Sequence, residues 1–246
     1  MQVLQLKGLS KSFGGLAAVR DVSLEISSGE RKALIGPNGA GKTTLFNLIT
    51  GVFPSSAGEI LLFGRDVTNR PSHKRTALGM ARTFQITSLF PKLSVLENVL
   101  LALAGVGSTK LVMWKPLSSY EHLMGRARHL LEEAGYWDRR DTEVRNLSHG
   151  EQRQIEVVLG LASSPRLLLL DEPAAGLSSG ESREMAEFLK RLDPGLAILL
   201  IEHDMDVVFD VVSSISVLHF GAIVESGRNA DIRASTRVQE IYLGTG

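Results

Sequence analysis

The strongest chemical pattern in the chain is the run Gly36-Pro37-Asn38-Gly39-Ala40-Gly41-Lys42-Thr43, which fits G-x-x-x-x-G-K-[ST]. Its glycines let the backbone come close to phosphate oxygens and offer them N–H groups. A helix after the loop would turn the positive end of its dipole toward the same phosphates. Lys42 would reach the β- and γ-phosphates, and the Thr43 hydroxyl would ligate Mg²⁺. The run predicts a phosphate-binding loop that continues into Thr44; the alternative is a glycine-rich turn with a chance lysine.

A second chemical pattern is an acidic pair at the end of an apolar run. Asp171 and Glu172 directly follow residues 167–170, which are all leucine. Ligands of parallel sheets collect beyond the carboxyl ends of the strands, where this pair would lie. Asp171 would hold Mg²⁺ directly or through water, and Glu172 would act as the general base that polarises water. The alternative is a pair of surface acids at a strand end.

Alternating strands and helices are expected to position these two patterns. The loop follows an apolar run over 32–35 and precedes a helical pattern that contains Leu45, Leu48 and Ile49. Apolar runs over 166–170 and 196–201, with a helix over 182–192 between them, are typical of a βαβ unit in a parallel sheet covered on both faces. Further strands are expected over 3–6, 22–26 and 59–63, helices over 94–105 and 120–135 with Gly135 as the stop, and a loop over 110–116.

A serine motif shortly before the acidic pair suggests a second anion site. Residues 146–154 are N-L-S-H-G-E-Q-R-Q, which resembles the L-S-G-G-Q signature of ATP-binding-cassette (ABC) ATPases, in the order that family uses. Ser148 and the amides near Gly150 and Glu151, at a helix start, would bind phosphate oxygens. Ser148 and Glu151 also fit a capping box, and both roles are compatible. Beside the first phosphate loop, a second clamp suggests a dimer that encloses ATP, although His149 and Glu151 depart from the signature.

The resemblance to ABC ATPases extends over nearly the whole chain and implies roles for three further residues. Gln85 would sense Mg²⁺ and the attacking water, His203 would contact the γ-phosphate, and Phe13 would stack on adenine. From the residues alone, each has a structural alternative: a polar strand end, a structural histidine and a core phenylalanine. The implied fold is α/β, with a P-loop NTPase core around a parallel sheet, an N-terminal antiparallel β-subdomain and an inserted helical subdomain. One domain would span 1–246, with the core and β-subdomain over 1–85 and 161–246 and the helical subdomain over 86–160.

Shorter phrases resemble the ATP-binding subunits of branched-chain amino acid importers, while urea and short-amide importers and lipopolysaccharide-export ATPases remain alternatives. That resemblance implies an ATPase at the cytoplasmic face of the inner or plasma membrane, paired with a second copy or a sister ATPase. It also implies integral membrane permease subunits and, indirectly, a periplasmic or extracellular solute-binding protein. Ser178 replaces the aspartate of the common form. The phrases lie at 81–85 with 89–90, 93–99, 173–177, 201–205 and 238–244.

The permease would dock near 85–98, where Ile86, Leu89, Phe90 and Leu93 suit an apolar groove as well as they suit core packing.

The composition of the chain argues against several other classes of function. Lysine plus arginine and aspartate plus glutamate each number 27, so the whole chain presents no net field to nucleic acid or anionic lipid. We therefore expect no nucleic acid partner. The cysteine count of zero excludes disulfides and thiolate chemistry.

No apolar run approaches the ~18 residues of a membrane span, and no signal peptide is expected at the start.

Two other classes of function fit the sequence less well than a transport ATPase does. Soluble cassette ATPases that act on nucleic acid or the ribosome typically carry two cassettes or a long coiled-coil insertion. A P-loop kinase or switch GTPase would leave residues 147–152 and His203 unexplained, and the chain has no guanine-specifying Asn-Lys-x-Asp sequence.

Overall fold

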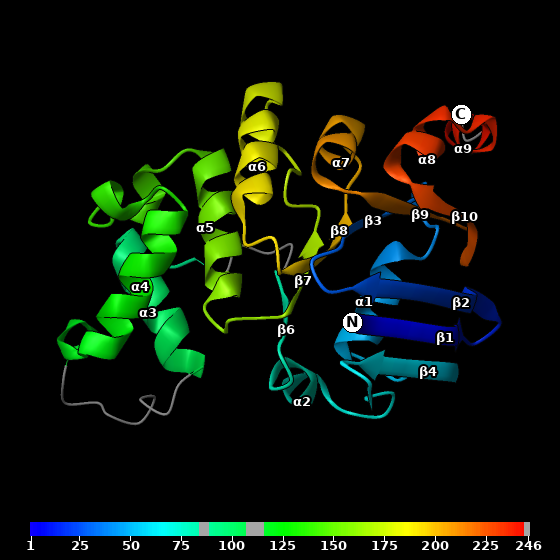
Figure 1. Cartoon of the computed structure of the whole chain (residues 1–246), viewed down its shortest axis with the longest axis horizontal. Helices are drawn as coiled ribbons and strands as arrows, with labels where there is room; N and C mark the ends of the chain where they lie inside the picture. The colour runs from blue at the N-terminus through cyan, green and yellow to red at the C-terminus, as the bar shows by residue number, and fades with distance from the viewer. Residues whose placement is uncertain (84–88, 107–115, 244–246) are drawn as a thin grey trace.

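Two β-sheets form the centre of the molecule, and helices pack against them (Figure 1). The computed structural model describes residues 1–83, 89–106 and 116–243. The smaller sheet is antiparallel, has the strand order β2-β1-β4-β5 and is built from the first 66 residues. Its strands are β1 (Gln2–Phe13), β2 (Leu16–Ser27), β4 (Ala57–Leu62) and β5 (Arg65–Asp66).

The larger sheet has the order β10-β9-β3-β8-β7-β6 and is parallel except for the pairing of β10 with β9. Because parallel strands end at one edge, the loops after β3, β7 and β8 meet there. The two sheets confirm the predicted α/β fold with a parallel core sheet and an N-terminal antiparallel sheet. The strands are β3 (Arg31–Ile35), β6 (Met80–Arg82), β7 (Leu167–Asp171), β8 (Ala197–Ile201), β9 (Ser214–His219) and β10 (Ala222–Arg228).

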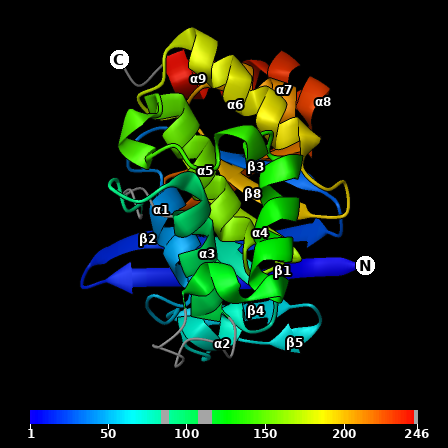
Figure 2. The ribbon, with the colours of Figure 1, turned by 90° about the vertical axis from the view of Figure 1, so that its left-hand side faces the viewer.

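Helices α3, α4 and α5 lie together at one end of the molecule, beside the edge of the larger sheet formed by β6 and β7 (Figures 1 and 2). Gly135 ends α4 in a left-handed conformation with φ 78°, as the sequence predicts. The helices are α1 (Lys42–Thr50), α2 (Ser72–Thr76), α3 (Val95–Val106), α4 (Glu121–Glu133), α5 (His149–Leu161), α6 (Ser179–Arg191), α7 (Met205–Val211), α8 (Asn229–Ala234) and α9 (Thr236–Leu243). Short 3-10 turns occupy 117–119, 137–139 and 144–146.

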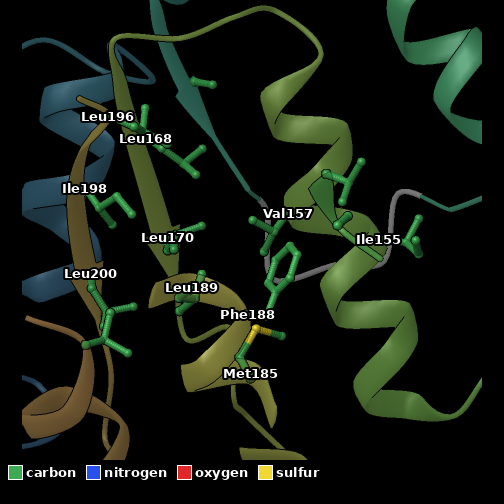
Figure 3. Close-up of a cluster of buried hydrophobic side chains, with 14 of the residues drawn as sticks. Ile155, Val157, Leu168, Leu170, Met185, Phe188, Leu189, Leu196, Ile198 and Leu200 are labelled. Atoms are coloured by element: carbon green, nitrogen blue, oxygen red, sulfur yellow. The ribbon is translucent and has the colours of Figure 1, made fainter. Parts of the chain in front are cut away.

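Alternate residues of the central strands enter two separate hydrophobic clusters. Leu168 and Leu170 of β7 pack with α5 and α6, together with Phe188 and Leu189 of α6 (Figure 3). Leu167 and Leu169 of the same strand join the other cluster, which contains α1 and the smaller sheet. Both faces of β7 are therefore dry, which explains why its sequence is a continuous leucine run and not an alternating one.

A buried arginine closes the carboxyl end of α1, the helix that follows the phosphate loop. The Arg75 side chain donates to the carbonyls of Leu48 and Ile49, at 2.6 and 2.7 Å, and also to Arg70 and Thr68. Those first two carbonyls belong to the last turn of α1, where carbonyls run short of helix amides; Leu48 also accepts from the amide of Gly51 at 3.1 Å. Burial lowers the pKa of Arg75 to about 10, so its guanidinium still carries its charge at neutral pH.

We expect Arg75→Met to lower the free energy of unfolding by about 3 kcal/mol, because it removes a buried charged donor that four backbone carbonyls share. Denaturant unfolding followed by circular dichroism measures this value. The matched control is Lys74→Met, the same substitution at the exposed neighbouring position, with an expected change within about 0.5 kcal/mol. Equal losses in the two variants would contradict a bracing role for Arg75.

Candidate active site

The loop of residues 36–41 lies at the carboxyl edge of the larger sheet, between β3 and α1. Two of its glycines are required by close backbone neighbours. A Cβ at Gly36 would lie 2.0 Å from the carbonyl oxygen of Leu218, and one at Gly41 would lie 2.4 Å from that of Ala18. Gly41 also has φ 105°, a conformation that side chains disfavour. Strands β9 and β2 thus press the loop into a tight turn whose backbone stays bare.

Lys42 folds back over this loop and is 6% exposed. Its Nζ donates to the carbonyls of Gly36 at 2.5 Å and of Pro37 at 3.0 Å. Burial lowers the pKa of Lys42, and the nearby carboxylates of Glu172 and Asp171 partly oppose that shift. The ammonium group is therefore poorly hydrated and faces two anionic groups, so an added phosphate would find it with little water to displace.

Asp171 ends β7 and has one carboxylate oxygen in use and one free. Its Oδ2 lies 2.7 Å from Nη2 of Arg82 in a buried ion pair. Its Oδ1 is buried and, within the part of the chain that the structure describes, has no hydrogen-bond partner. A buried carboxylate oxygen without a partner is costly unless it binds a ligand. Asp171 therefore fits a cation or a cation-bound water.

The donors around Asp171 suit magnesium in particular. Thr43 is the second residue of α1 and lines the cavity that also contains Lys42 and Glu172. Across residues 1–83, 89–106 and 116–243, three or more histidine, cysteine or acidic side chains do not gather into a metal cluster. Mg²⁺ usually takes one or two carboxylates and completes its shell with water and substrate phosphates. One carboxylate beside a hydroxyl and a phosphate loop matches that pattern.

Arg82 is a residue of this site that sequence reasoning missed. Its Nη1 lies 2.6 Å from Oδ1 of Asn47 and 3.3 Å from Oγ1 of Thr50, both on α1. Since its other nitrogen holds Asp171, Arg82 connects the helix of the phosphate loop to the acidic strand end. An arginine at a strand end has no distinctive spacing, so only the fold shows which carboxylate it pairs with.

Glu172 and His203 come from neighbouring strand ends and touch each other. The Nε2 atom of His203 lies 2.7 Å from Oε1 of Glu172. Glu172 has a positive φ of 52°, and its amide donates to the carbonyl of Ile201 at 2.9 Å. A strained non-glycine backbone of this kind is common where a side chain must be aimed at a ligand. Both side chains border the phosphate loop.

The residue between the strand end and His203 was also missed by sequence reasoning. Glu202 is 2% exposed, and its carboxylate accepts from the amides of Ala174 at 2.6 Å and His203 at 2.9 Å. Burial raises the pKa of Glu202, while these amide donors oppose the shift. Glu202 therefore joins the loop after β7 to the loop after β8. The only signal in the sequence was an acidic residue next to the predicted histidine. Spacing alone does not show that this residue is buried.

One open cavity of about 840 Å³ contains most of the predicted site residues. Phe13 stands at its rim, half exposed, with its ring edge against Phe53 at 5.4 Å between centroids and with Lys11 above it. Phe220, which sequence reasoning did not select, lines the cavity with its side chain largely exposed and has φ 45°. Further lining residues are Asn38, Gly39, Ala40, Gly41, Lys42, Thr43, Thr44, Glu172 and His203.

Not every predicted site residue comes to this cavity. Ser148, Gly150 and Glu151 lie at the start of α5, where Ser148 and Glu151 form the predicted capping box, and they do not line it. A single chain thus places its two predicted phosphate-binding elements apart. Gln85 and Ile86 lie outside the described residues.

The fold and the glycine-lined cavity, with its buried lysine and acidic strand end, together define a P-loop nucleoside triphosphatase.

Comparison with known proteins identifies the family. The ABC transporter family matches residues 19–175, and the chain belongs to that family as an ATPase cassette. It is 36% identical over 247 residues to the probable branched-chain amino acid transport ATP-binding protein LivG of Archaeoglobus fulgidus, covering 99% of this chain and 96% of that protein. It is 35% identical over 244 residues to the lipopolysaccharide export system ATP-binding protein LptB of Acidithiobacillus ferridurans, covering 99% and 97%.

Solved structures of cassettes match the whole fold. The ADP conformation of MJ1267, an ATP-binding cassette of an ABC transporter, superposes with a TM-score of 0.88 at 29% identity and covers 99% of each chain. A dimeric post-hydrolysis state of the cassette MJ0796, bound to ADP and Pi, superposes with a TM-score of 0.73 at 25% identity, covering 92% of this chain and 98% of that one. The family likeness therefore includes nucleotide binding.

We expect Lys42→Ala to weaken nucleotide binding at least ~10-fold, because it removes a charge-assisted contact to phosphate from a poorly hydrated site. Isothermal titration calorimetry with ATP and Mg²⁺ measures the affinity. Lys7→Ala changes an exposed surface lysine and serves as the control, with unchanged affinity. Full affinity in Lys42→Ala would rule out the phosphate-loop assignment.

Proposed function

We propose that this chain binds ATP with Mg²⁺ in the cavity of residues 36–44 and hydrolyses it as the motor subunit of a solute importer. The observation that carries this proposal is one cavity that contains a buried lysine and a Glu–His pair, with the charge of the buried Asp171 carboxylate, one oxygen of which has no partner among the described residues, acting on the same lysine. That set provides phosphate binding, a cation ligand and a base, which are the parts that phosphoryl transfer to water requires.

In this proposal Lys42 and the loop amides hold the β- and γ-phosphates. Thr43, Asp171 and Gln85 would hold Mg²⁺, which when bound would supply positive charge beside the transferring phosphoryl group. Glu172 accepts a proton from the attacking water, and His203 contacts the γ-phosphate. Phe13 stacks on adenine. Arg82 keeps Oδ2 of Asp171 occupied, so that Oδ1 is the oxygen turned to the cation.

We further propose that two copies, or this chain and a sister ATPase, enclose ATP between them. Ser148, Gly150 and Glu151 of one protomer would then complete the phosphate site of its partner. Two findings support this arrangement: those residues lie away from the chain's own cavity, and a similar cassette is dimeric with ADP and Pi. The helix start of α5 has the anion-binding geometry that such a contact needs.

The transported solute is proposed from the relatives. LivG of Archaeoglobus fulgidus is named for branched-chain amino acid transport, and this chain shares 36% of its residues. We therefore propose uptake of branched-chain amino acids, with lipopolysaccharide export as the alternative that LptB suggests. Urea or short-amide import is a further alternative, carried by the sequence phrases alone.

Peripheral attachment to the cytoplasmic face of a membrane, through permease subunits, completes this proposal. The structure shows no helix among the described residues that is long and apolar enough to cross a bilayer. Of the four apolar residues predicted for a permease groove, Phe90 is 57% exposed, Leu93 is half-buried and Leu89 packs in the core. A solute-binding protein would act only through the permease, and no nucleic acid partner is proposed.

We also propose how the chain divides into a core and a helical subdomain. One cassette spans 1–246, with the core and β-subdomain over 1–85 and 161–246 and a helical subdomain over 86–160. Helices α3, α4 and α5, which gather at one end of the molecule, support those limits (Figure 1). A helical unit there would connect the exposed side chain of Phe90 to the start of α5.

The transport proposal is tested by purifying the tagged chain from detergent-solubilised membranes of its own cells. We expect a permease to co-purify and the deletion strain to lose uptake of labelled leucine. Loss of urea uptake, or accumulation of lipopolysaccharide with normal leucine uptake, would assign the chain to one of the alternatives. Recovery of nucleic acid without a membrane protein would contradict transport altogether.

We expect Glu172→Gln to keep ATP affinity but to lower hydrolysis at least ~10²-fold, since the amide cannot accept the proton of water. Phosphate release measures turnover, and calorimetry measures affinity. Glu225→Gln, a substitution of the same kind on β10, is the control and should leave turnover unchanged. Unchanged hydrolysis in Glu172→Gln would remove that residue from its proposed role.

A further inference from the structure

The start of α5 is already occupied by a carboxylate from the neighbouring helix. The amide of Gly150, in the first turn of α5, donates to Oε1 of Glu181 at 3.1 Å. Glu181 lies in the first turn of α6, the helix that follows the acidic pair Asp171 and Glu172 in the chain. The contact thus joins two helix starts whose sequences are 31 residues apart.

Glu181 is held in this position by its own helix. Its Oε2 accepts from the amide of Ser178 at 3.0 Å and from the Ser178 hydroxyl at 2.8 Å. These two residues form the capping box of α6, so the carboxylate is oriented before it reaches Gly150. The approach also explains the glycine, because a Cβ at Gly150 would lie 3.1 Å from Cβ and Cγ of Glu181.

Glu181 forms no ion pair among the described residues, and His149 at the start of α5 is the one group whose charge lowers its pKa. Glu151, the other acid at the start of α5, forms an ion pair with Arg139. Donors from Ser178 and Gly150 lower the pKa of Glu181, so it is ionised at neutral pH. A negative charge therefore lies at the start of α5, the site that we propose binds the phosphates of the partner's ATP.

We propose that Glu181 competes with the γ-phosphate of the partner's ATP for the amide of Gly150. One N–H group cannot donate fully to both acceptors, and two anions at one helix start repel each other. Glu181 thus holds the clamp of α5 closed to phosphate in the free chain and sets how much ATP is needed to join two protomers. This inference rests on the proposed ATP-enclosing dimer.

The test measures ATP-driven dimerisation in a Glu172→Gln background, where hydrolysis does not reopen the pair. Analytical ultracentrifugation at increasing ATP and Mg²⁺ gives the ATP concentration at half-dimerisation. We expect Glu181→Gln, which keeps an acceptor for Gly150 but removes the charge, to lower that concentration at least ~3-fold. The gain should shrink as salt rises from about 50 to 500 mM, because salt screens the charge.

Glu184→Gln is the matched control, since it removes the same charge one turn further along α6, on the exposed side. Its half-dimerisation concentration should equal that of the reference chain. An equal gain in Glu184→Gln would assign the effect to net charge and overturn the role of Glu181. Thermal melts check folding; if Glu181→Gln is unstable, Glu181→Asp, which withdraws the carboxylate from Gly150, replaces it with the same expected direction.

The outcomes separate the two proposals. If the reference chain forms no dimer with ATP, the pairing of two copies fails and this inference falls with it. If the reference dimerises but Glu181→Gln needs as much ATP or more, Glu181 is a structural brace and only this inference is overturned. A lower ATP requirement that disappears at high salt supports the competition.

Discussion

Charge held out of water at one edge of a parallel sheet is the feature on which the rest of this structure depends. Lys42, Asp171 and Glu172 converge there, and the first two are nearly inaccessible to solvent. Such groups are stable only when fixed partners replace their hydration. The loop carbonyls serve Lys42 and the guanidinium of Arg82 serves Asp171. Oδ1 of Asp171, which has no partner among the described residues, marks a place where a ligand would lower the free energy.

Long-range polar contacts tie the loops of the site to one another. Arg82 joins α1 to the end of β7, and Glu202 joins the loop after β7 to His203. Glu181 then joins the helix after that loop to the start of α5. These hydrogen bonds therefore connect the Glu172 loop both to the cavity of the phosphate loop and to the start of α5.

The two predicted phosphate-binding elements of the chain lie apart. The phosphate loop and the start of α5 belong to one chain yet do not share a cavity. A second cassette would be a way to bring a serine-tipped helix start opposite a phosphate loop, and the similar cassette MJ0796 is dimeric with ADP and Pi bound. In the proposed dimer, nucleotide would form part of the interface, and its binding would favour contact between protomers.

Local patterns in the sequence were enough to predict a βαβ unit in a parallel sheet, both acidic positions of the strand end and the phosphate loop as a motif, while the full fold was implied by the family resemblance. The reason is that backbone turns, strand burial and helix caps depend on near neighbours: the leucine run of β7 is continuous because both of its faces are covered. The sequence also identified the capping box of Ser148 and Glu151, which later proved to be formed.

Tertiary structure alone decided which distant groups meet. Arg82 pairs with Asp171 across 89 positions, Glu202 with Ala174 across 28, and Glu181 with Gly150 across 31. No periodicity or motif spacing encodes such pairs, because their partners are chosen by strand order and helix packing. The sequence by itself determined which chemical groups are present. Their charges, their orientations and their freedom to bind a ligand were decided by the tertiary structure, because only the sheet brings these groups to a common edge.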